Sequence, residues 1–568
     1  MRTAVAVADR ASAAHSPANG RWTSIVGHAL RARVARRSAR LSDTRWWAEH
    51  TARVQRAQLR WLLRRAARCE FGRSHGFARL ASLPDDEMLA GYRASAPVAD
   101  WYAFRERIAR MREGGERDVL WPGLVRDFAQ TSGTTAGDKF IPVSREMMRS
   151  NYRASLDIFA HAVRFGVSLP GLMGGRSLFI GGSTSVETNE HGVRTGDLSG
   201  LVTGLIRWPL SEVYLPGREI ALMSDWPAKI DAMARLCVDH DVRFISGMPS
   251  WAIVLFDRML QVARERGRAA SCIRDLWPNL RVFVHGGVKY APFDPRVRRF
   301  WSGNENEDIP HRIELYPASE AFVAIQDEPN REGVSQPSLR LCADHGNFFE
   351  FVPLEEIDSA SPRAFACDEV EPGVRYVVVL STCAGLWRYV LGDVVEFDSI
   401  PRARLGLQGP APGTGGRDFV GPCRLRIVGR HRHFINAFGE NIIVEHVENA
   451  VAAAAREAGV TVGEFTAAPV YPGEGRRPGL ELAVEIAGTV PAAFVEAFDR
   501  ALKSQNVDYT TKRTADLGMA PPVVTPLPPG AIHRWLESRG KLGGQHKCPR
   551  CANSREIIES VVAVARGW

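Results

Sequence analysis

The segment Phe128-Ala-Gln-Thr-Ser-Gly-Thr-Thr-Ala-Gly-Asp-Lys139 alternates small hydroxylated residues with glycine. Such a loop can bring backbone N–H groups and hydroxyls close to phosphate oxygens. It is not a Walker A loop, because three residues separate Gly133 from Gly137 and Asp138 precedes Lys139. A turn without any ligand can have the same composition. The segment alone therefore leaves phosphate binding and a plain turn open.

The sequence on the C-terminal side of this loop alternates between strand-like and helix-like stretches. Alternation of this kind predicts α/β layers. Three later strand-like runs follow one another without long helices, which predicts a meander or a small β-barrel. The first strand-like runs are 177–182, 242–249, 280–287 and 312–317, with a helix-like stretch at 227–240, and the later runs are 348–354, 374–382 and 386–397.

The last part of the chain has the pattern of a separate small α+β domain. The Gly-, Pro- and Arg-rich stretch 401–423 predicts an exposed loop. The strand-like run 424–430 then leads into a new unit with helices at 444–458 and 492–506 and a strand at 481–488. We therefore expect a flexible arm over 1–25, a large domain over 26–428 and a small mobile domain over 429–568.

An arginine-rich helical pattern covers residues 26–70. A basic helix with Trp46, Trp47 and Trp61 could bind nucleic acid or a membrane surface. No aromatic and basic platform or known nucleic-acid module follows it. We therefore favour an amphipathic layer with its arginines in solvent, and expect neither a nucleic-acid partner nor membrane insertion.

The overall composition is that of a soluble globular protein, with 568 residues, 45% hydrophobic and 24% charged. The formal net charge is +9, but only seven of the 73 basic residues are lysine, so the excess of arginine is weak support for any partner. No apolar run is long enough for a transmembrane helix. Nine scattered cysteines and a polar N-terminus favour a reduced, cytoplasmic setting.

Four further motifs carry side chains suited to nucleotide chemistry. Each has an ordinary alternative, a solvated turn or a hairpin, when taken alone. A carboxylate that follows a strand, as Glu320 does, is well placed for Mg²⁺. The motifs are Tyr316-Pro-Ala-Ser319-Glu320, Trp387-Arg-Tyr-Val-Leu-Gly-Asp393, Val428-Gly-Arg430-His-Arg and Gly543-Gly-Gln-His-Lys547-Cys548-Pro-Arg-Cys551.

The order and spacing of these motifs resemble the adenylate-forming superfamily, which includes acyl-CoA synthetases and luciferases. Within it the chain resembles the auxin-responsive-promoter (Gretchen Hagen three) family of acyl acid amido synthetases. The closest signatures are FAQTSGTTAGDKFIPVS, LYPASEAF, FFEFVPLEEID, GLWRYVLGDVVEF and the ending Gln545-His-Lys-Cys-Pro-Arg550. The resemblance implies a large adenylate-forming domain of α/β layers plus a small β-barrel, and a smaller mobile α+β domain.

The resemblance also implies roles for individual residues. Lys547 and Glu320 would be catalytic, with Glu320 holding Mg²⁺. Tyr316 would lie against adenine opposite the turn of His285, Gly286 and Gly287, Asp393 would bind the ribose and Arg430 would act across the hinge. ATP would also be bound by Thr131, Ser132, Gly133, Thr134, Thr135, Gly137 and Ser319.

The implied reaction joins a carboxylic acid to an amine, an amino acid in the leading interpretation. Met248, Ser250 and Trp251 would form one wall of the acyl pocket and suit an apolar or aromatic acid. His285, His431 and His433 are candidate general bases. A thiol acceptor, coenzyme A or a carrier protein, is the alternative. A redox or zinc module at Cys548 and Cys551 is disfavoured, because no second such cysteine pair completes the site.

Overall fold

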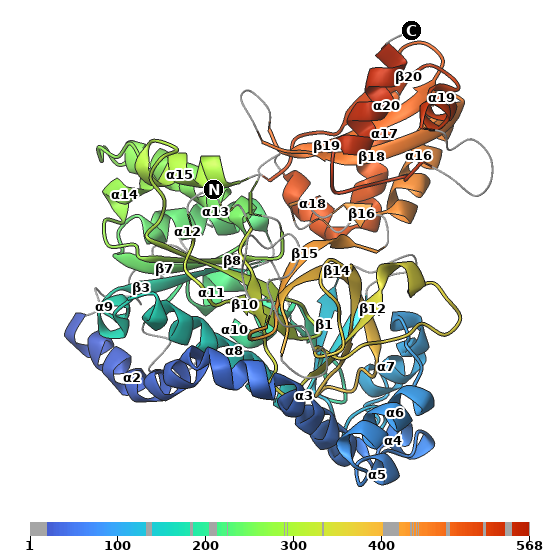
Figure 1. Ribbon diagram of the computed structural model, residues 1–568. Helices are drawn as coiled ribbons and strands as arrows, with labels where there is room; N and C mark the ends of the chain where they lie inside the picture. The colour runs from blue at the N-terminus through green and yellow to red at the C-terminus, as the bar shows by residue number, and fades with distance from the viewer. Residues whose placement is uncertain are drawn as a thin grey trace.

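The computed structural model describes residues 20–131, 139–181, 186–203, 213–223, 225–288, 290–291, 293–331, 334, 336–401, 420–431, 434–435, 437–438, 440, 442–472, 477–514, 518–539 and 548–566. Figure 1 shows a large body, coloured blue to yellow, and a smaller orange and red C-terminal unit beside it. The mixed α/β architecture predicted from the sequence is confirmed.

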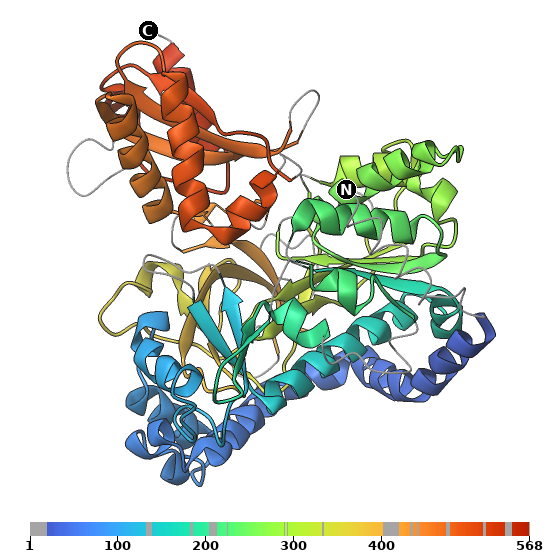
Figure 2. The same ribbon diagram turned by 180° about the vertical axis from the view of Figure 1, so that it is seen from behind.

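Two long helices, α2 (Gly20–Ser42) and α3 (Thr44–Ala66), run along the outside of the large body (Figures 1 and 2). The sequence predicted a single helical region here. The helices separate at Asp43, whose carboxylate accepts a hydrogen bond of 2.9 Å from the Trp46 N–H and caps α3. α3 buries one face against the strands, and buried Gln55 donates to the Ala343 carbonyl at 2.6 Å. This burial agrees with an amphipathic layer, but the expectation that its arginines lie in solvent is wrong for Arg56, which is buried and pairs with Asp368 at 3.0 Å.

Short helices connect α3 to the first strands and cover the same end of the sheet. They are α4 (Glu70–Ser74), α5 (Phe77–Leu80), α6 (Asp85–Ser95), η1 (Trp101–Ala103) and α7 (Arg105–Arg112). A small sheet of order β2-β1-β5-β4 follows. Its strands are β1 (Asp127–Thr131), β2 (Lys139–Val143), β4 (Glu187–Thr188) and β5 (Arg194–Gly196).

The central feature is an eleven-stranded sheet, whose order is β12-β13-β14-β15-β11-β10-β9-β8-β7-β3-β6. Neighbouring strands from β9 to β6 are parallel, as expected for strands joined by helical crossovers. These strands are β3 (Arg176–Ile180), β6 (Tyr214–Leu215), β7 (Val242–Gly247), β8 (Val282–Gly286) and β9 (His311–Pro317).

Helices cover both faces of the parallel strands. Val282, Val284 and Ile313 pack with α8 (Arg145–Arg164) on one face. Phe283, one residue away, points to the other face, where it packs with α12 (Trp226–Cys237) and α13 (Pro249–Glu265). The remaining helices of the large body are α9 (Leu169–Met173), α10 (Leu198–Thr203), α11 (Arg218–Ala221), α14 (Ile273–Leu276) and α15 (Asp294–Ser302).

The other half of the same sheet is antiparallel, and β12, β13 and β14 form the predicted meander. β15 pairs with both β14 and β11, so this run, expected to lead into the C-terminal unit, is built into the large sheet. The strands are β10 (Phe322–Gln326), β11 (Leu339–Leu341), β12 (Phe348–Pro353), β13 (Tyr376–Ser381), β14 (Tyr389–Ser399) and β15 (Arg424–Arg430), with the turn η3 (Leu354–Glu356). Most of the predicted loop 401–423 lies outside the described residues.

The C-terminal unit is a three-stranded sheet, of order β18-β19-β20, between two helix pairs. It touches the large body where Phe293 meets Phe438, with ring centroids 5.8 Å apart. The unit has the predicted α+β character. Its elements are β16 (Phe434–Ile435), β17 (Ile442–Ile443), α16 (Val444–Ala458), β18 (Val462–Val470), β19 (Gly479–Ile486), α17 (Ala492–Gln505), α18 (Val507–Arg513), β20 (Val523–Leu527), α19 (Ala531–Ser538) and α20 (Glu556–Arg566).

The described helices and the nine cysteines bear on two expectations that came from the composition. None of the helices in the described ranges combines the length and the apolar character needed to span a bilayer. All nine cysteines are buried and unpaired with one another, including Cys548 and Cys551.

Candidate functional site

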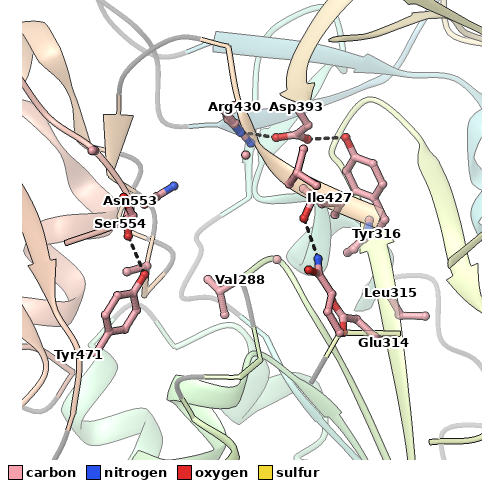
Figure 3. A pocket seen from close by; sticks show the side chains of 17 residues that line it. Val288, Glu314, Leu315, Tyr316, Asp393, Ile427, Arg430, Tyr471, Asn553 and Ser554 are labelled. Atoms are coloured by element: carbon pink, nitrogen blue, oxygen red, sulfur yellow. Dashed lines mark hydrogen bonds and ion pairs between the residues drawn. The ribbon is translucent and has the colours of Figure 1, made fainter. Parts of the chain in front are cut away.

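A cavity of about 300 Å³ lies where the ends of β8, β9, β14 and β15 face the C-terminal unit (Figure 3). The large body contributes three of the predicted nucleotide residues, Tyr316, Asp393 and Arg430, and the turn at Gly287. The C-terminal unit contributes Ala437, Tyr471 and the segment Ala552–Ser554. Segments far apart in the sequence therefore meet at one cavity.

Asp393 is the centre of a polar cluster in this cavity, in which Asp393 and Tyr316 are buried and Arg430 is exposed. Its carboxylate accepts a hydrogen bond of 2.6 Å from the Tyr316 hydroxyl and another from the Arg430 Nε (Figure 3). Asp393 and Arg430 are direct partners in the β14–β15 ladder, so strand pairing fixes this contact. Burial and the neighbouring Asp393 charge raise the pKa of Tyr316 well above its usual value, which keeps the hydroxyl a donor.

The turn after β8 needs its glycines. A Cβ on Gly286 would lie 2.5 Å from the Leu315 carbonyl oxygen of the neighbouring strand, which no side chain tolerates. Gly287 has φ of +83° and lines the cavity. His285, just before them, is buried and stacks on Tyr290 with centroids 4.2 Å apart. Burial holds the pKa of His285 well below its ordinary value, so the imidazole is neutral.

Glu320 lies just beyond Tyr316, in the turn that joins β9 to β10 through a hydrogen bond of 3.0 Å from the Ala318 N–H to the Ala321 carbonyl. Burial raises the pKa of the Glu320 carboxyl, and the positive charges of Lys139 and Arg430 partly oppose this rise. The Tyr389 hydroxyl is in hydrogen-bonding contact with the same carboxylate. Glu320 thus belongs to the polar surroundings of the Asp393 cluster.

Lys139, which follows the glycine-rich segment, is a charged neighbour of Glu320 for which the sequence predicted no role. It begins β2 directly opposite Thr131, the last residue of β1. Burial lowers the pKa of the Lys139 ammonium, while the Glu320 charge opposes this shift. The sequence could have indicated a functional role for Lys139, because it is one of only seven lysines in the chain and follows the glycine-rich stretch.

The predicted acyl-pocket residues lie beside the cavity rather than in its lining. Met248 approaches the Gly287 turn, with its sulfur 3.4 Å from the point where a Cβ on Gly287 would stand. Ser250, at the start of α13, has a buried hydroxyl without a hydrogen-bond partner in the described structure. Trp251 packs on Trp226 with centroids 5.0 Å apart. The three residues therefore stand together next to the predicted adenine-binding turn.

The cavity also contains residues that no motif singled out. Glu314, Val288 and Gln336 come from the large body, and Tyr471 and Asn553 from the C-terminal unit. The Tyr471 hydroxyl donates to the Asn553 carbonyl at 2.8 Å (Figure 3). None of these residues was assigned to a functional motif, and only the folded structure brings them to the cavity.

Some of the predicted residues lie in the described part of the chain but outside the cavity, and others lie beyond it. Ser319 is half-buried in the β9–β10 turn. Cys548, which follows Lys547, is described, and the nearby Pro549 carbonyl accepts a hydrogen bond of 2.7 Å from the Thr466 hydroxyl of β18. The predicted residues that lie outside the described part of the chain are Ser132, Gly133, Thr134, Thr135, Gly137 and Lys547, together with the candidate base His433.

Among the described residues that line the cavity, no group of three acidic or histidine side chains lies close enough together to hold a cation. Among the described residues, the group of acidic and histidine side chains close enough to hold a metal is Asp157, Asp344 and His345, on the far side of the sheet. Arg37 already occupies that group, with Nε 2.6 Å from Asp157 and Nη1 2.6 Å from Asp344. We therefore assign it to anchoring α2. Glu320, in contrast, offers one carboxylate, which suits Mg²⁺ that is shared with substrate phosphates.

Known proteins resemble this chain over most of its length. Residues 45–212 match the GH3 family N-terminal domain, residues 340–404 the GH3 family central domain and residues 445–556 the GH3 family C-terminal domain. The indole-3-acetic acid-amido synthetase GH3.8 of Oryza sativa subsp. indica is 25% identical over 552 residues, covering 83% of this chain and 84% of its own length. The probable indole-3-acetic acid-amido synthetase GH3.1 of Arabidopsis thaliana is 23% identical over 541 residues, covering 82% and 84%.

Solved structures share the fold. The GH3.15 acyl acid amido synthetase has a TM-score of 0.55 at 16% identity and covers 93% of this chain and 96% of its own. A 2-hydroxyisobutyryl-CoA ligase has a TM-score of 0.50 at 16% identity, covering 91% and 92%. Both have the architecture seen here, a large body with a smaller C-terminal unit. The three domain matches, which together span more than half of the chain, show that this protein belongs to the GH3 family.

Proposed function

We propose that this protein is an ATP-dependent acyl acid amido synthetase, a ligase that adenylates a carboxylic acid and transfers the acyl group to an amine, namely an amino acid. The observation that carries the proposal is the cluster of Tyr316, Asp393 and Arg430 in one cavity with the Gly287 turn. Family membership supports the same reaction class.

The nucleotide would occupy the cavity between the large body and the C-terminal unit. Adenine would lie between the Tyr316 ring and the turn at Gly286 and Gly287, which lacks side chains and so leaves room for a flat base. Asp393 accepts hydrogen bonds and would receive the ribose hydroxyls, with Arg430 and Tyr316 fixing its orientation. The loop that begins after Thr131 would contact the phosphates.

The two half-reactions follow from the chemistry of carboxylic acids. A carboxylate is a poor acyl donor, because oxide is a poor leaving group. Attack of the acid on the α-phosphorus of ATP releases pyrophosphate and forms an acyl-AMP, from which AMP leaves readily. The amine then attacks the acyl carbon, and an amide and AMP are formed. Lys547 would stabilise the charge that develops on the phosphate oxygens, as cations do in phosphoryl transfer.

Glu320 is the proposed Mg²⁺ ligand. Its carboxylate lies beside Tyr316 and close to the positive charges of Lys139 and Arg430, so this region offers one acidic group for a cation and two basic groups for the anionic phosphates. When bound, Mg²⁺ supplies neutralisation of phosphate charge. Lys139 would share this task from the opposite side of Glu320.

The acid would lie beyond the Gly287 turn, near Met248, Ser250 and Trp251. Two of these side chains are apolar, which favours an apolar or aromatic acid, and the unpaired Ser250 hydroxyl could orient a polar group. His285 is an unfavourable general base, because its ring is buried and both nitrogens lack partners in the described structure. We expect a cytoplasmic enzyme, in agreement with nine unpaired cysteines.

A pyrophosphate-release screen tests the proposal. Aryl, indolyl and fatty acids are each offered with ATP and Mg²⁺, with and without the twenty amino acids, and the products are identified by mass spectrometry. We expect acid-dependent pyrophosphate release and an amide product. Formation of a thioester with coenzyme A and no amide would favour the thiol alternative, and no acid-dependent release would contradict adenylation itself.

A further inference from the structure

Lys512 is a buried cation that neither the nucleotide cavity nor the proposed reaction uses. It lies on α18, at the edge of the C-terminal unit that faces the large body (Figure 1). The residue is only 3% exposed, and its Nζ donates a hydrogen bond of 3.3 Å to the Asp508 carbonyl. Burial lowers the pKa of the Lys512 ammonium, and nearby carboxylates oppose this shift. A lysine in such a place is costly unless its surroundings compensate for the lost water.

The large body supplies part of this compensation. The Lys512 Nζ lies 5.7 Å from the centroid of the Trp251 ring at the start of α13, which is the geometry of a cation–π contact. The Asp197 carboxylate, just before α10, adds a favourable charge interaction with the same ammonium. This carboxylate is itself oriented, because it accepts a hydrogen bond of 2.6 Å from the Ser199 N–H. Lys512 therefore connects the C-terminal unit to two elements of the large body.

The C-terminal unit holds the base of this contact in place. The Glu440 carboxylate also attracts the Lys512 ammonium. It accepts hydrogen bonds from the N–H groups of Ala437 at 3.1 Å and Phe438 at 2.6 Å. Asn506, which caps α18, donates to the Glu440 carbonyl at 2.7 Å. α18 and the backbone before Glu440 are thus tied together, so a force on Lys512 is passed to the unit as a whole.

We propose that Lys512 is a positioning residue, which holds the C-terminal unit in the orientation seen here by docking on Trp251 and Asp197 of the large body. Its link to catalysis rests on the proposed function, since it assumes two half-reactions that need different positions of this unit. In the docked orientation Ala552, five residues after Lys547, lines the nucleotide cavity. We therefore assign this orientation to adenylation, and the separation of Lys512 from Trp251 to the movement that follows.

The orientation can be measured in the full chain without any substrate. All nine native cysteines are buried, so two exposed cysteines introduced by substitution can carry a pair of spin labels in the folded protein. Arg264→Cys, near the end of α13, and Glu496→Cys, on α17, place one label on each unit at exposed positions. Double electron–electron resonance then gives the distribution of distances between the two labels.

Lys512→Met removes the charge but keeps a side chain of similar length. With native Lys512 we expect one main distance, and in Lys512→Met a second distance should increase about ten-fold relative to the first, the effect of losing one desolvated cation–π contact. Asp197→Asn removes a partner charge from the large body instead and should shift the distribution in the same direction. It keeps the test valid if circular dichroism shows that Lys512→Met does not fold. Lys503→Met is the control, because Lys503 pairs with Asp499 inside the C-terminal unit at 2.7 Å.

The catalytic consequence is measured as a ratio of two single-turnover rates. One is pyrophosphate release with the acid identified by the screen, and the other is amide formation from the added acyl-AMP. If each rate follows the population of its own orientation, Lys512→Met should raise the ratio of amide formation to pyrophosphate release about ten-fold. A residue that only stabilised the fold would lower both rates together and leave the ratio unchanged.

An unchanged distance distribution in Lys512→Met and Asp197→Asn would overturn the docking role, and an unchanged ratio of rates would overturn the role in catalysis. Wild type without acid-dependent pyrophosphate release would instead contradict the proposed function. The distances between the labels would still test the docking of Lys512 in that case, so the two failures are distinguishable.

Discussion

The two walls of the cavity are built in different ways. On the large body, Tyr316, Asp393 and Arg430 lie on strands of one sheet, and ladder pairing fixes their register. On the C-terminal unit, Tyr471 and Asn553 lie outside regular strands, just after β18 and just before α20, and one hydrogen bond joins them. The wall on the large body is held in place by strand pairing, whereas the wall on the C-terminal unit depends on a few local contacts.

This difference suggests a division of labour. A wall held by a sheet suits tight binding of a ligand in one orientation. A wall carried by a separate unit, with Lys547 just before its tethered segment at Cys548, suits a group that acts during one half-reaction and then withdraws. The predictions below test whether binding and chemistry are separated in this way.

The largest effect should come from Lys547→Ala. Loss of the cation that we place on the oxygens of the attacked phosphate should lower acid-dependent pyrophosphate release by about a thousand-fold, the scale seen when one stabilising group is removed. ATP affinity should stay within about two-fold, because the large body binds the nucleotide. Lys541→Ala, which removes the lysine six positions earlier in the sequence, is the control. Normal release by Lys547→Ala would remove the role of this lysine.

Asp393→Asn should affect nucleotide binding, whereas Lys547→Ala should affect the chemical step. The substitution keeps the size of the side chain but presents N–H groups to Arg430 and to the ribose, so we expect ATP binding to weaken by about a hundred-fold. Calorimetry measures this affinity. Glu396→Gln, on the same strand but in surface pairs with Arg375 and Arg426, should leave it unchanged. Undiminished affinity in Asp393→Asn would mean that the ribose lies elsewhere.

Glu320→Gln should raise the Mg²⁺ concentration for half-maximal pyrophosphate release by about ten-fold, since a neutral amide is a weaker ligand for Mg²⁺ than a carboxylate. The pKa of Glu320 is raised by burial, so its charge is lost at a higher pH than that of an exposed glutamate. In wild type the Mg²⁺ requirement should therefore increase as the pH falls. In Glu320→Gln it should not depend on pH in that range. An unchanged requirement would place the metal on other groups.

The contrast between the wall built from sheet strands and the wall of the C-terminal unit also explains which residues could be predicted from the sequence. Tyr316, Asp393 and Arg430 were found because motifs of fixed spacing surround them, and the helices and strands around them have clear periodicity. The separation of α2 from α3 at Asp43 was not predicted, because the helical pattern of the sequence continues on both sides of Asp43. Only the structure shows that Asp43 caps α3. β15 looked like the start of a new unit, because pairing with β14 and β11 is a long-range property that composition does not encode.

Glu314 and Tyr471 could not have been predicted from the sequence, and the reason is again that long-range contacts place them. Each is an ordinary residue in an ordinary strand or loop, and each becomes part of the cavity only because two units of the chain meet there. A carboxylate in a strand is usually solvated, so the sequence gives no reason to single one out. Its burial and its unpaired state appear only after folding.

The smallest effect should come from Tyr471→Phe, which tests the weaker wall directly. The pKa of this hydroxyl is raised to about 12, mainly by burial, so it donates to the Asn553 carbonyl throughout the neutral range. Its loss should cost about 1 kcal/mol of stability, typical of one hydrogen bond. The segment that carries Asn553 should then be held less firmly, raising KM for ATP about two-fold while kcat is nearly constant. Thermal unfolding and steady-state kinetics measure both, with Tyr152→Phe, an exposed tyrosine on α8, as the control. If Tyr471→Phe left KM unchanged but lowered kcat strongly, this wall would take part in the chemistry through Tyr471 as well as through Lys547, and the simple separation of binding from catalysis would not hold.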